Sequence, residues 1–385
     1  MSRSLCILGA TGSIGKNCLD VVARTGGRFK VEALAARTNV RALVDAARSC
    51  GAKRIALAEC EALREIPESS LSGLEVACGP EALAELAALP GVDIVVNAMV
   101  GAAGLVPSVA ALESGKRLAL ANKESLVMAG RRLMQSAREN PGAEIIPVDS
   151  EHSALFQLIH DLSPGELKEV VITASGGPFR GYTFERLEKV TFSESLEHPT
   201  WSMGPKITID SATLANKGLE VIEAHFLFSL EYDDIKVLVH PQSIVHGMAV
   251  LNDGAVLGHM GVPDMRIPIQ YALTYPERVK NDIRAPDFSA LGKLTFEPVD
   301  RRNFPCLELA YEAGRKGGVA AAVYNAANEA AVEKFSKGEI AFTAIPQVIE
   351  NTIACAPGIE DPSIGEILEA DNWAREYALA RKNLS

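Results

Sequence analysis

Short β-prone runs and helical stretches alternate through the first 148 residues of this 385-residue chain, and this alternation constrains the fold more than any other feature. Strand, helix and strand in regular succession are typical of a parallel sheet covered by helices on both faces. We therefore predict an α/β domain over residues 1–148. Its seven predicted strands are Leu5–Leu8, Val31–Ala35, Arg54–Ala58, Leu74–Cys78, Asp93–Asn97, Arg117–Leu120 and Glu144–Pro147.

Three glycines at the first strand-to-helix turn predict a dinucleotide site. Gly9, Gly12 and Gly15 follow the first predicted strand and open the first helix. In such a turn the first glycine permits the tight bend, the second lets the backbone approach a pyrophosphate, and the third allows close helix–sheet packing. The spacing G-x-x-G-x-x-G is a variant of the usual fingerprint, and its place in the alternating pattern favours a Rossmann-type domain over a purely structural turn.

The end of the second predicted strand indicates which dinucleotide is bound. NAD enzymes usually carry an acid there for the ribose 2′-hydroxyl, whereas this chain has Arg37, Thr38 and Asn39. Glu32 is acidic but lies in the middle of the strand. A cation with polar neighbours suits a 2′-phosphate, so the sequence favours NADP(H) over NAD(H). The alternative for Arg37 is a solvated surface charge.

The rest of the chain is too long to join the same hydrophobic core. We predict an α+β domain over 149–290, a Pro- and Asp-rich linker over 291–305, and a helical domain over 306–385. Hydrophobic periodicity is already weak from about Asn281 onward, before the linker begins. Strands of the middle domain are expected at Glu169–Thr173, Lys236–His240 and Ile244–Leu251. The last domain has expected helices at Leu307–Lys316, Ala320–Lys337, Phe342–Ile353 and Ile364–Lys382.

Charge and hydropathy exclude two classes of partner. The chain has 38 Lys and Arg against 49 Asp and Glu, a formal net charge of −11, whereas a general nucleic-acid binder needs a positive surface. The longest apolar stretch, Val92–Leu112, is interrupted by charged, amide, Gly and Pro residues and does not suit a membrane span. The N-terminal residues resemble neither a signal nor a transit peptide. We expect a cytoplasmic protein, or an organelle protein whose targeting peptide has been removed.

The seven cysteines are scattered, and none forms a C-x-x-C pair. This distribution argues against a disulfide framework and against a structural zinc site. We expect buried, inert thiols.

Acidic residues after the last strand of the first domain suggest a metal site. Asp149 and Glu151 are two residues apart, so in an extended segment their side chains face the same way. A third carboxylate could be Glu220 or, equally, Glu223. Oxygen ligands in this number suit Mg²⁺ or Mn²⁺ better than zinc. The alternative is a helix cap or a set of solvated acids.

Three polar segments of the middle domain suggest a phosphate site with a cover. The loop 194–204 carries Trp201 among Pro, Gly and polar residues, as a lid that excludes water would. Ser175–Phe179, with its two glycines, suits close backbone approach to an anion, and Asp210–Lys217 adds Ser, Asn and Lys donors. Each segment alone is as compatible with an ordinary turn.

Taken together, the ordered motifs resemble the 1-deoxy-D-xylulose 5-phosphate reductoisomerase family, whose members use NADPH and a divalent metal in the non-mevalonate isoprenoid pathway. The resemblance spans the chain. It is carried by GATGSIG at 9–15, NKES at 122–125, PVDSEHSA at 147–154, SGGPF at 175–179, HPTWSMG at 198–204, DSATLANKGLE at 210–220, VHPQSIVHG at 239–247 and YNAANEAAV at 324–332. The main departure is Arg37-Thr38, where some members have Gly-Lys or Gly-Ser.

The resemblance implies roles for individual residues. The metal ligands would be Asp149, Glu151 and Glu220, which selects Glu220 over Glu223. NADPH would lie against Thr11, Gly12, Ser13, Ile14, Asn122, Glu124 and Gly204, with Arg37 and Asn39 at the 2′-phosphate. The substrate would contact Lys123, Ser150, Glu151, Ser175, His198, Trp201, Ser211, Asn216, Lys217 and Glu220, with Ser175, Ser211, Asn216 and Lys217 chiefly at its phosphate.

The resemblance also implies an activity and an assembly. The expected reaction is rearrangement and NADPH-dependent reduction of 1-deoxy-D-xylulose 5-phosphate to 2-C-methyl-D-erythritol 4-phosphate by a homodimer, with Mg²⁺ or Mn²⁺ bound and Co²⁺ as a further candidate. Lys123 would stabilise charge on substrate oxygens or relay a proton. The rivals are another NADP enzyme, such as an aspartate-semialdehyde or sugar-phosphate dehydrogenase, and a non-catalytic NADP sensor. Aspartate-semialdehyde dehydrogenases rely on a catalytic cysteine in the second domain, and this chain has none between Cys78 and Cys306.

Overall fold

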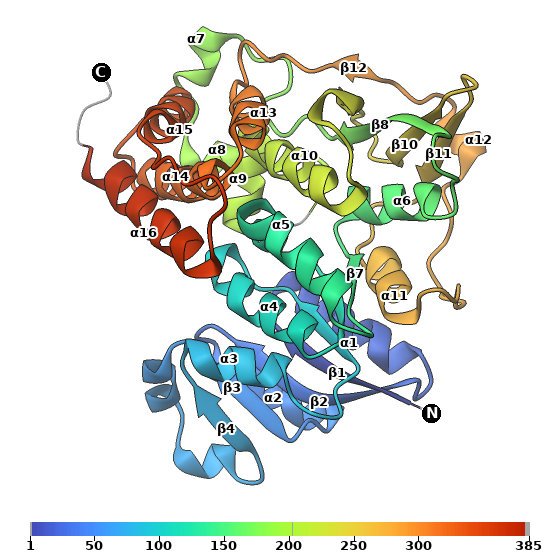
Figure 1. Ribbon diagram of the computed structural model, residues 1–385, viewed down its shortest axis with the longest axis vertical. Coiled ribbons are helices and arrows are strands. Elements are labelled where there is room, and N and C mark those ends of the chain that lie inside the picture. The colour runs from blue at the N-terminus through green and yellow to red at the C-terminus, as the bar shows by residue number, and fades with distance from the viewer. Residues whose placement is uncertain (1, 202, 382–385) are drawn as a thin grey trace. The chain divides into compact units, whose positions relative to one another are not determined.

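The structure is a computed structural model that describes residues 2–201 and 203–381 (Figure 1). Ser202 of the predicted lid and Lys382 at the end of the last predicted helix lie outside the described residues. The chain divides into two compact units, each made from separate stretches. Unit 1 comprises Met1–Ser125, Arg131–Ser153 and Asp264–Ile283, and unit 2 comprises Leu126–Gly130, Ala154–Pro263 and Arg284–Ser385. Our division into three functional domains stays a prediction.

A seven-stranded parallel sheet forms the centre of unit 1, in the order β4-β3-β2-β1-β5-β6-β7. All seven predicted strands are confirmed: β1 (Arg3–Leu8), β2 (Phe29–Ala36), β3 (Arg54–Leu57), β4 (Glu75–Cys78), β5 (Ile94–Asn97), β6 (Arg117–Leu120) and β7 (Glu144–Pro147). The strand order reverses between β1 and β5, and the carboxyl ends at such a switch point are where α/β folds bind ligands.

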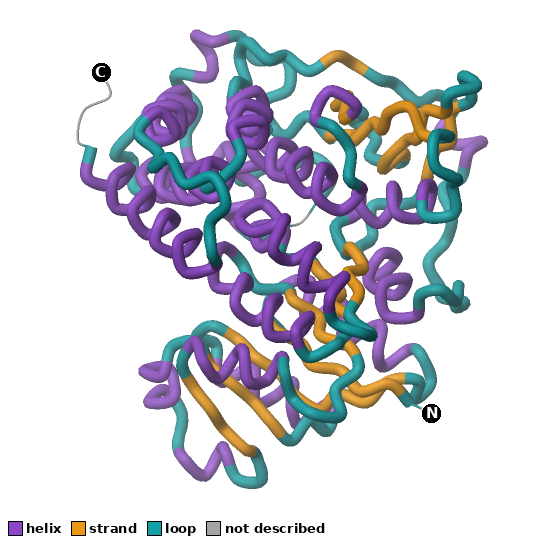
Figure 2. The backbone as a smooth tube through the Cα atoms, in the orientation of Figure 1, coloured by secondary structure: helices purple, strands orange, loops and turns teal. Residues whose placement is uncertain are grey.

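Helices and short 3-10 turns connect these strands (Figure 2). The α-helices are α1 (Ser13–Arg24), α2 (Val40–Cys50), α3 (Pro80–Ala87), α4 (Leu105–Glu113) and α5 (Lys123–Glu139), and the turns are η1 (Cys60–Glu65), η2 (Glu68–Leu71) and η3 (Gly101–Gly104). Strands of a parallel sheet whose two faces are both covered have nearly continuous apolar sequences. Such runs are easy to recognise, which is why the strands of this sheet could be predicted from the sequence.

A disulfide in unit 1 corrects our expectation that all cysteines are thiols. Cys60 and Cys78 are bonded, 18 residues apart in sequence. Strands β3 and β4 pair in parallel with Leu57 opposite Cys78, so Cys60 follows its strand close to Cys78. The sequence spacing gave no sign of this pairing, because it depends on the register of two strands. Cys6 and Cys18 are buried thiols as expected, and burial raises the pKa of each to about 12.

A late segment of the chain completes unit 1. Helix α11 (Arg266–Thr274) packs against α1, β6 and β7. The nearly buried Arg117 guanidinium on β6 pairs with Glu144, at 2.6 Å from its Nε, and its Nη1 lies 3.5 and 3.4 Å from the carbonyl oxygens of Ala272 and Leu273 at the end of α11. The sequence predicted no helix here.

Unit 2 contains a five-stranded mixed sheet, in the order β11-β10-β8-β9-β12. Its strands are β8 (Leu167–Ala174), β9 (Ile235–Val239), β10 (Val245–Leu251), β11 (Val256–Met260) and β12 (Glu297–Pro298). The three expected strands are confirmed. The two edge strands were missed: β11 is exposed, so its apolar residues do not alternate with polar ones as in a half-buried strand, and β12 is a two-residue strand within the segment predicted as linker.

Helices make up most of unit 2. They are α6 (Ser150–Ile159, whose first turn belongs to unit 1), α7 (Phe184–Leu187), α8 (Phe192–Ser195), α9 (Pro205–Thr213), α10 (Ala215–Phe228), α12 (Phe288–Leu291), α13 (Cys306–Lys316), α14 (Ala320–Ser336), α15 (Ile345–Ala354) and α16 (Ile364–Ala380), with turns η4 (Tyr232–Asp234) and η5 (Phe342–Ala344). The predicted C-terminal helices are confirmed, except that Phe342–Ile353 begins as the η5 turn. Among residues 2–201 and 203–381, no helix has both the length and the apolar character to cross a membrane.

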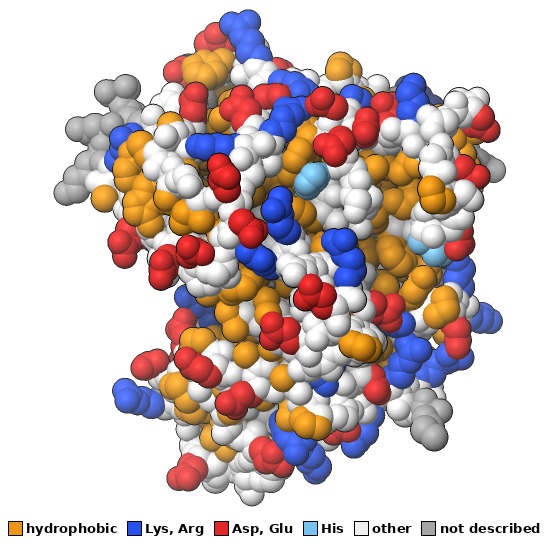
Figure 3. Space-filling model, viewed as in Figure 1, with side chains coloured by type: hydrophobic (Ala, Val, Ile, Leu, Met, Phe, Trp, Pro, Cys, Tyr) orange, Lys and Arg blue, Asp and Glu red, His pale blue; other side chains and the backbone are white. Residues whose placement is uncertain are grey.

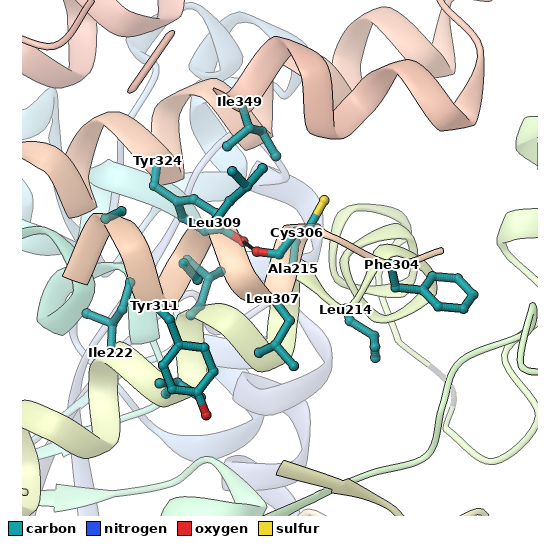
Figure 4. Close-up of a cluster of buried hydrophobic side chains, with 14 of the residues drawn as sticks. Leu214, Ala215, Ile222, Phe304, Cys306, Leu307, Leu309, Tyr311, Tyr324 and Ile349 are labelled. Atoms are coloured by element: carbon teal, nitrogen blue, oxygen red, sulfur yellow. Dashed lines mark hydrogen bonds between the residues drawn. The ribbon is translucent and has the colours of Figure 1, made fainter. Parts of the chain in front are cut away.

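The core of unit 2 joins α10 to the C-terminal helices (Figure 4). Tyr324 of α14 is fully buried and donates to the carbonyl oxygen of Cys306 at 3.1 Å. A Cβ at Gly218 would lie 2.5 Å from Cβ of Ala310, so glycine permits the close approach of α10 and α13. The C-terminal helices thus pack directly on the helix that carries Asn216, Lys217 and Glu220.

Candidate active site

The glycine turn of unit 1 is tightly packed and leaves no room for side chains at two of its glycines. Gly9 has φ +82°, and a Cβ there would lie 2.3 Å from the Ala98 carbonyl oxygen. A Cβ at Gly15 would lie 2.4 Å from the Gly9 carbonyl oxygen, so neither position accepts another residue without a shift. Gly12 is the N-cap of α1 and has no side chain to cap its amides. The predicted cofactor residues Thr11, Ser13 and Ile14 lie beside those amides, and an uncapped helix start of this kind suits an anion.

Arg37 and Asn39 lie just beyond β2, at the predicted 2′-phosphate end. Arg37 is 81% exposed, and its Nε lies 2.7 Å from Oε1 of Glu59, which leaves four guanidinium N–H groups for other acceptors. Asn39 caps α2, because its Oδ1 accepts from the Ala42 amide at 3.1 Å. Asn39 therefore has a structural role of its own, with its Nδ2 remaining as a donor.

Asn122 and Glu124 lie where β6 leads into α5, and both are buried. Asn122 Nδ2 donates to the carbonyl oxygens of Met99 and Gly101, each at 3.1 Å, and to Glu124 Oε2 at 2.9 Å. These bonds fix the turn after β5 beside the glycine turn. These two predicted cofactor residues are therefore buried, and their hydrogen bonds hold the loops at the carboxyl ends of β5 and β6 in place.

Asp149 and Glu151 come together in a helical turn, so the predicted extended geometry is wrong. Helix α6 begins at Ser150, the Glu151 amide donates to Asp149 Oδ1 at 3.2 Å, and ligand oxygens of the two acids lie within 4.8 Å of each other. The chain turns here because Asp149 acts as a helix cap, which sequence spacing alone did not distinguish from a strand end. Ser150 Oγ lies 2.5 Å from Glu151 Oε2.

Two basic side chains, Lys123 and His152, contact Asp149. The almost buried Lys123 places its Nζ 2.6 Å from Asp149 Oδ2, and the fully buried His152 places its Nδ1 3.1 Å from Asp149 Oδ1. Sequence reasoning missed His152. Its position three residues after Asp149, one helical turn on, is the signal that could have identified it.

In unit 2, the loop after β8 packs tightly on the segment that carries Ser211. Gly176 and Gly177 have φ +87° and +65°, and a Cβ at Gly177 would lie 2.7 Å from the Ser211 carbonyl oxygen. The Gly177 amide donates to Ser175 Oγ at 3.2 Å. The glycines therefore allow two backbones to meet, and they bring two predicted phosphate ligands, Ser175 and Ser211, to one place.

His198 lies between these two serines. Its Nε2 is 2.9 Å from Ser175 Oγ and 3.2 Å from Ser211 Oγ. Its Nδ1 accepts from the amides of Thr200 and Trp201, at 3.1 and 2.9 Å. A nitrogen that accepts cannot carry a proton, so this His is neutral with its proton on Nε2. Burial lowers its pKa below 6.5, in agreement with that state.

This arrangement predicts an acid-sensitive loop. Because the folded pKa of His198 is lowered, the loop conformation is stable above about pH 6.5 and loses stability as the pH falls below it. In a Trp373→Phe background, we expect Trp201 fluorescence to report this transition. His198→Asn keeps an acceptor for the two amides and should remove the transition. The same transition in His198→Asn would assign it elsewhere, for instance to His246, whose pKa burial lowers to about 4.

Asn216 and Lys217 both contact Glu220 at the start of α10. Leu214, with φ +61°, separates α9 from α10. Glu220 is 1% exposed and accepts from Asn216 Nδ2 at 2.5 Å and from Lys217 Nζ. Glu223, the alternative ligand, is also buried, one turn further along α10.

The predicted lid loop leads directly into α9. Trp201 is half-buried, with its ring centroid 6.4 Å from that of His246. Gly204 is the N-cap of α9, and its carbonyl oxygen accepts from the Thr208 amide at 3.1 Å. We assigned no role to His246 from the sequence, although this residue lies in the motif VHPQSIVHG at 239–247.

Three family models match the chain. The model described as 1-deoxy-D-xylulose 5-phosphate reductoisomerase matches residues 5–130, that of the C-terminal domain of the same enzyme matches 145–228, and one described as DXP reductoisomerase C-terminal domain matches 260–377.

Relatives and solved structures agree with these matches. Proteins named 1-deoxy-D-xylulose 5-phosphate reductoisomerase from Pelotomaculum thermopropionicum and Moorella thermoacetica are 48% and 50% identical, each over 98% of both chains. A Zymomonas mobilis structure of that name in complex with NADPH is 40% identical over 100% of both chains, with a TM-score of 0.92. A DOX-P reductoisomerase structure with NADPH, fosmidomycin and magnesium is 39% identical over 98% of both, also with a TM-score of 0.92.

Proposed function

The chain belongs to the 1-deoxy-D-xylulose 5-phosphate reductoisomerase family, and on that premise we propose which of its residues perform the reaction. The activity is the NADPH-dependent conversion of 1-deoxy-D-xylulose 5-phosphate to 2-C-methyl-D-erythritol 4-phosphate in the non-mevalonate pathway. The observation that carries the residue assignment is the pair of polar centres, one around Asp149 in unit 1 and one around His198 and Ser211 in unit 2.

Asp149, Glu151 and Glu220 are the proposed ligands of one divalent cation, Mg²⁺ or Mn²⁺. Their chemistry fits such an ion, because all three offer carboxylate oxygens. Asp149 and Glu151 bring their oxygens within 4.8 Å of each other, and the Glu220 carboxylate is buried beside Lys217. When bound, the cation supplies Lewis-acid polarisation of substrate oxygens, and the nicotinamide supplies the hydride.

NADPH is proposed to bind along the carboxyl edge of the unit 1 sheet. The glycine turn with Thr11, Gly12, Ser13 and Ile14 would hold the pyrophosphate, and Asn122 and Glu124 would shape the nicotinamide end, together with Gly204 of unit 2. Arg37 would take the 2′-phosphate, because its guanidinium is exposed and keeps free N–H groups beyond its bond to Glu59.

The substrate phosphate is proposed to bind in unit 2. Ser175, Ser211, Asn216 and Lys217 supply hydroxyl, amide and ammonium donors, and neutral His198 orients the two serines through Nε2. Trp201 would cover the substrate and exclude water, while Lys123 and Ser150 would contact its reacting end. Lys123 would hold a positive charge, or a proton, at oxygens on which negative charge develops.

The direct test is oxidation of NADPH by the purified protein with 1-deoxy-D-xylulose 5-phosphate. We expect turnover only with a divalent cation (Mg²⁺, Mn²⁺ or Co²⁺) and a clear preference for NADPH over NADH. Turnover of aspartate semialdehyde instead, or tight NADPH binding with no turnover of any sugar phosphate, would favour one of the two rival functions.

We further propose a homodimer that forms through strand β11. This strand is an edge of the unit 2 sheet, and Val256, Leu257 and Met260 on it are exposed. An edge strand with apolar side chains favours pairing with another strand, and a twofold dimer would use the same strand from each chain.

Leu257→Lys tests this interface. Two charges would enter a twofold contact, so we expect the dimer dissociation constant to rise about a hundredfold, measured by light scattering over a dilution series. Leu379→Lys on α16 is the matched control, since Leu379 is 37% exposed and Leu257 38%. An unchanged dimer in the Leu257 variant would place the interface elsewhere.

The proposed location is the cytoplasm. Supporting this, Cys6, Cys18, Cys50, Cys306 and Cys355 are thiols, although the Cys60–Cys78 disulfide is unusual in that compartment. Nucleic acid is not a proposed partner, since the net charge is −11 and acidic and basic side chains are interspersed over the face in Figure 3.

A further inference from the structure

We propose that Asn328, on the C-terminal helix α14, is a positioning residue for the phosphate site, acting through Asp210 on Ser211. The inference rests on the proposed function, since it takes Ser211 as a ligand of the substrate phosphate. It assigns a task in substrate binding to a helix that contributes no side chain to the proposed site.

Asn328 lies in a place where asparagine is costly. It is in the middle of an Ala-rich helix, where its helix propensity is poor, and it is fully buried. Its Nδ2 donates to Oδ1 of Asp210 at 2.8 Å. Within residues 2–201 and 203–381, its own Oδ1 is buried and has no hydrogen-bond partner. The bond to Asp210 is thus the contact that explains a polar side chain at this position.

Asp210 is a buried acid in the last turn of α9. It is 1% exposed, and its Oδ2 lies 2.8 Å from Nζ of Lys206, one turn earlier on the same helix. A buried carboxylate needs both partners. Lys206 comes from α9 itself, whereas Asn328 comes from α14, so the bond to Asn328 is the polar contact that fixes Asp210 against the C-terminal helices.

Asp210 influences the phosphate site through the next residue, Ser211, because a shift of the Asp210 backbone also moves Ser211. Ser211 Oγ lies 3.2 Å from His198 Nε2, and the Ser211 carbonyl oxygen meets the Gly177 backbone so closely that a Cβ there would lie 2.7 Å away. A shift of Asp210 therefore moves a hydroxyl that is already in contact with His198 and disturbs the loop of Ser175. Hydrogen bonds weaken steeply as their distance and angle depart from the optimum, so a displaced Ser211 hydroxyl would hold a phosphate oxygen less well.

Asn328→Ala is the test, with Asn325→Ala as matched control. Asn325 is one turn earlier on α14, is equally buried, and also has an unpartnered Oδ1, but its Nδ2 donates to Glu329 at 3.2 Å. For Asn328→Ala we expect the KM for 1-deoxy-D-xylulose 5-phosphate and the inhibition constant of inorganic phosphate both to rise about tenfold, as for one lost hydrogen bond to a charged group. The KM for NADPH should stay unchanged. Asn325→Ala should lower Tm and leave all three constants unchanged.

An isosteric pair covers the case in which the alanine variants do not fold. Asn328→Asp and Asn325→Asp each place a carboxylate opposite an acid, Asp210 or Glu329, and only the first should raise the two phosphate-dependent constants. Wild-type constants in a folded Asn328 variant, or equal changes in both members of a pair, would overturn the proposal. Absence of turnover in the wild-type protein would instead overturn the proposed function.

Discussion

Glu220→Gln should reduce kcat about a thousandfold, because polarisation by a bound cation contributes several kcal/mol to transition-state stabilisation. The change keeps the size of the side chain but removes its charge. Glu220 is buried and accepts from Asn216 and Lys217, so the glutamine should stay in place while binding the cation weakly. Stopped-flow NADPH oxidation measures the rate, and titration with Mn²⁺ by electron paramagnetic resonance measures the affinity.

Glu223→Gln is the control, and it resolves the alternative that the sequence left open. Glu223 is on the same helix, one turn later, and is as deeply buried. If Glu220 is the ligand, Glu223→Gln should keep Mn²⁺ affinity and most of kcat, even if Tm falls. The reverse pattern, with Mn²⁺ affinity lost in Glu223→Gln and retained in Glu220→Gln, would exchange the two assignments.

Lys123→Met should reduce kcat about a hundredfold, the size expected when one preorganised charge at a developing oxyanion is removed. Its effect on the cation should be opposite to that of Glu220→Gln. Lys123 Nζ lies 2.6 Å from Asp149 Oδ2, so its positive charge competes with the cation for that carboxylate. We expect Mn²⁺ to bind Lys123→Met as tightly as the wild type, or more tightly, while turnover is lost.

Lys116→Met separates this effect from the general cost of losing a buried lysine. Lys116 is also in unit 1 and buried, and its Nζ donates to the carbonyl oxygens of Leu89 and Val92, at 2.5 and 2.8 Å. Its loss should lower Tm and leave kcat unchanged in the folded fraction. A Lys123→Met enzyme with wild-type kcat would remove Lys123 from the reaction.

The fold could be predicted where the local sequence pattern alone identifies a helix or a strand. The inner strands of unit 1, such as β3, β5 and β6, are buried along nearly their whole length, so each is a short, mainly apolar run between turn residues. The edge strands β11 and β12 carry no such pattern, because an exposed strand is defined by its neighbour. Helix α11 was missed for a similar reason: it belongs to unit 1 through contacts with α1, β6 and β7, far away in sequence.

The candidate site, which stays a proposal, could be outlined from the sequence where several polar residues fall in one motif. The glycine turn, the SGGPF loop and the Asn216–Glu220 helix start were recognisable as short runs with the right donors. The geometry of Asp149 and Glu151 could not be predicted, because two acids at this spacing occur both at the start of a helix and at the end of a strand. The Cys60–Cys78 bond needs the register of two strands, and the Asn328–Asp210 bond spans 118 residues. No local pattern reports contacts of that kind.

The discontinuous make-up of unit 1 has a consequence for how the protein is synthesised. Its seven strands are complete when residue 147 leaves the ribosome, yet α11, which packs on β6 and β7, follows only after the stretch Ala154–Pro263 of the other unit. At about 5–20 residues per second, that stretch takes roughly 6 to 22 seconds to translate. Throughout this interval the nascent chain lacks the carbonyl oxygens near Arg117 and the helix that packs on β6 and β7, so this side of the sheet is without its native cover.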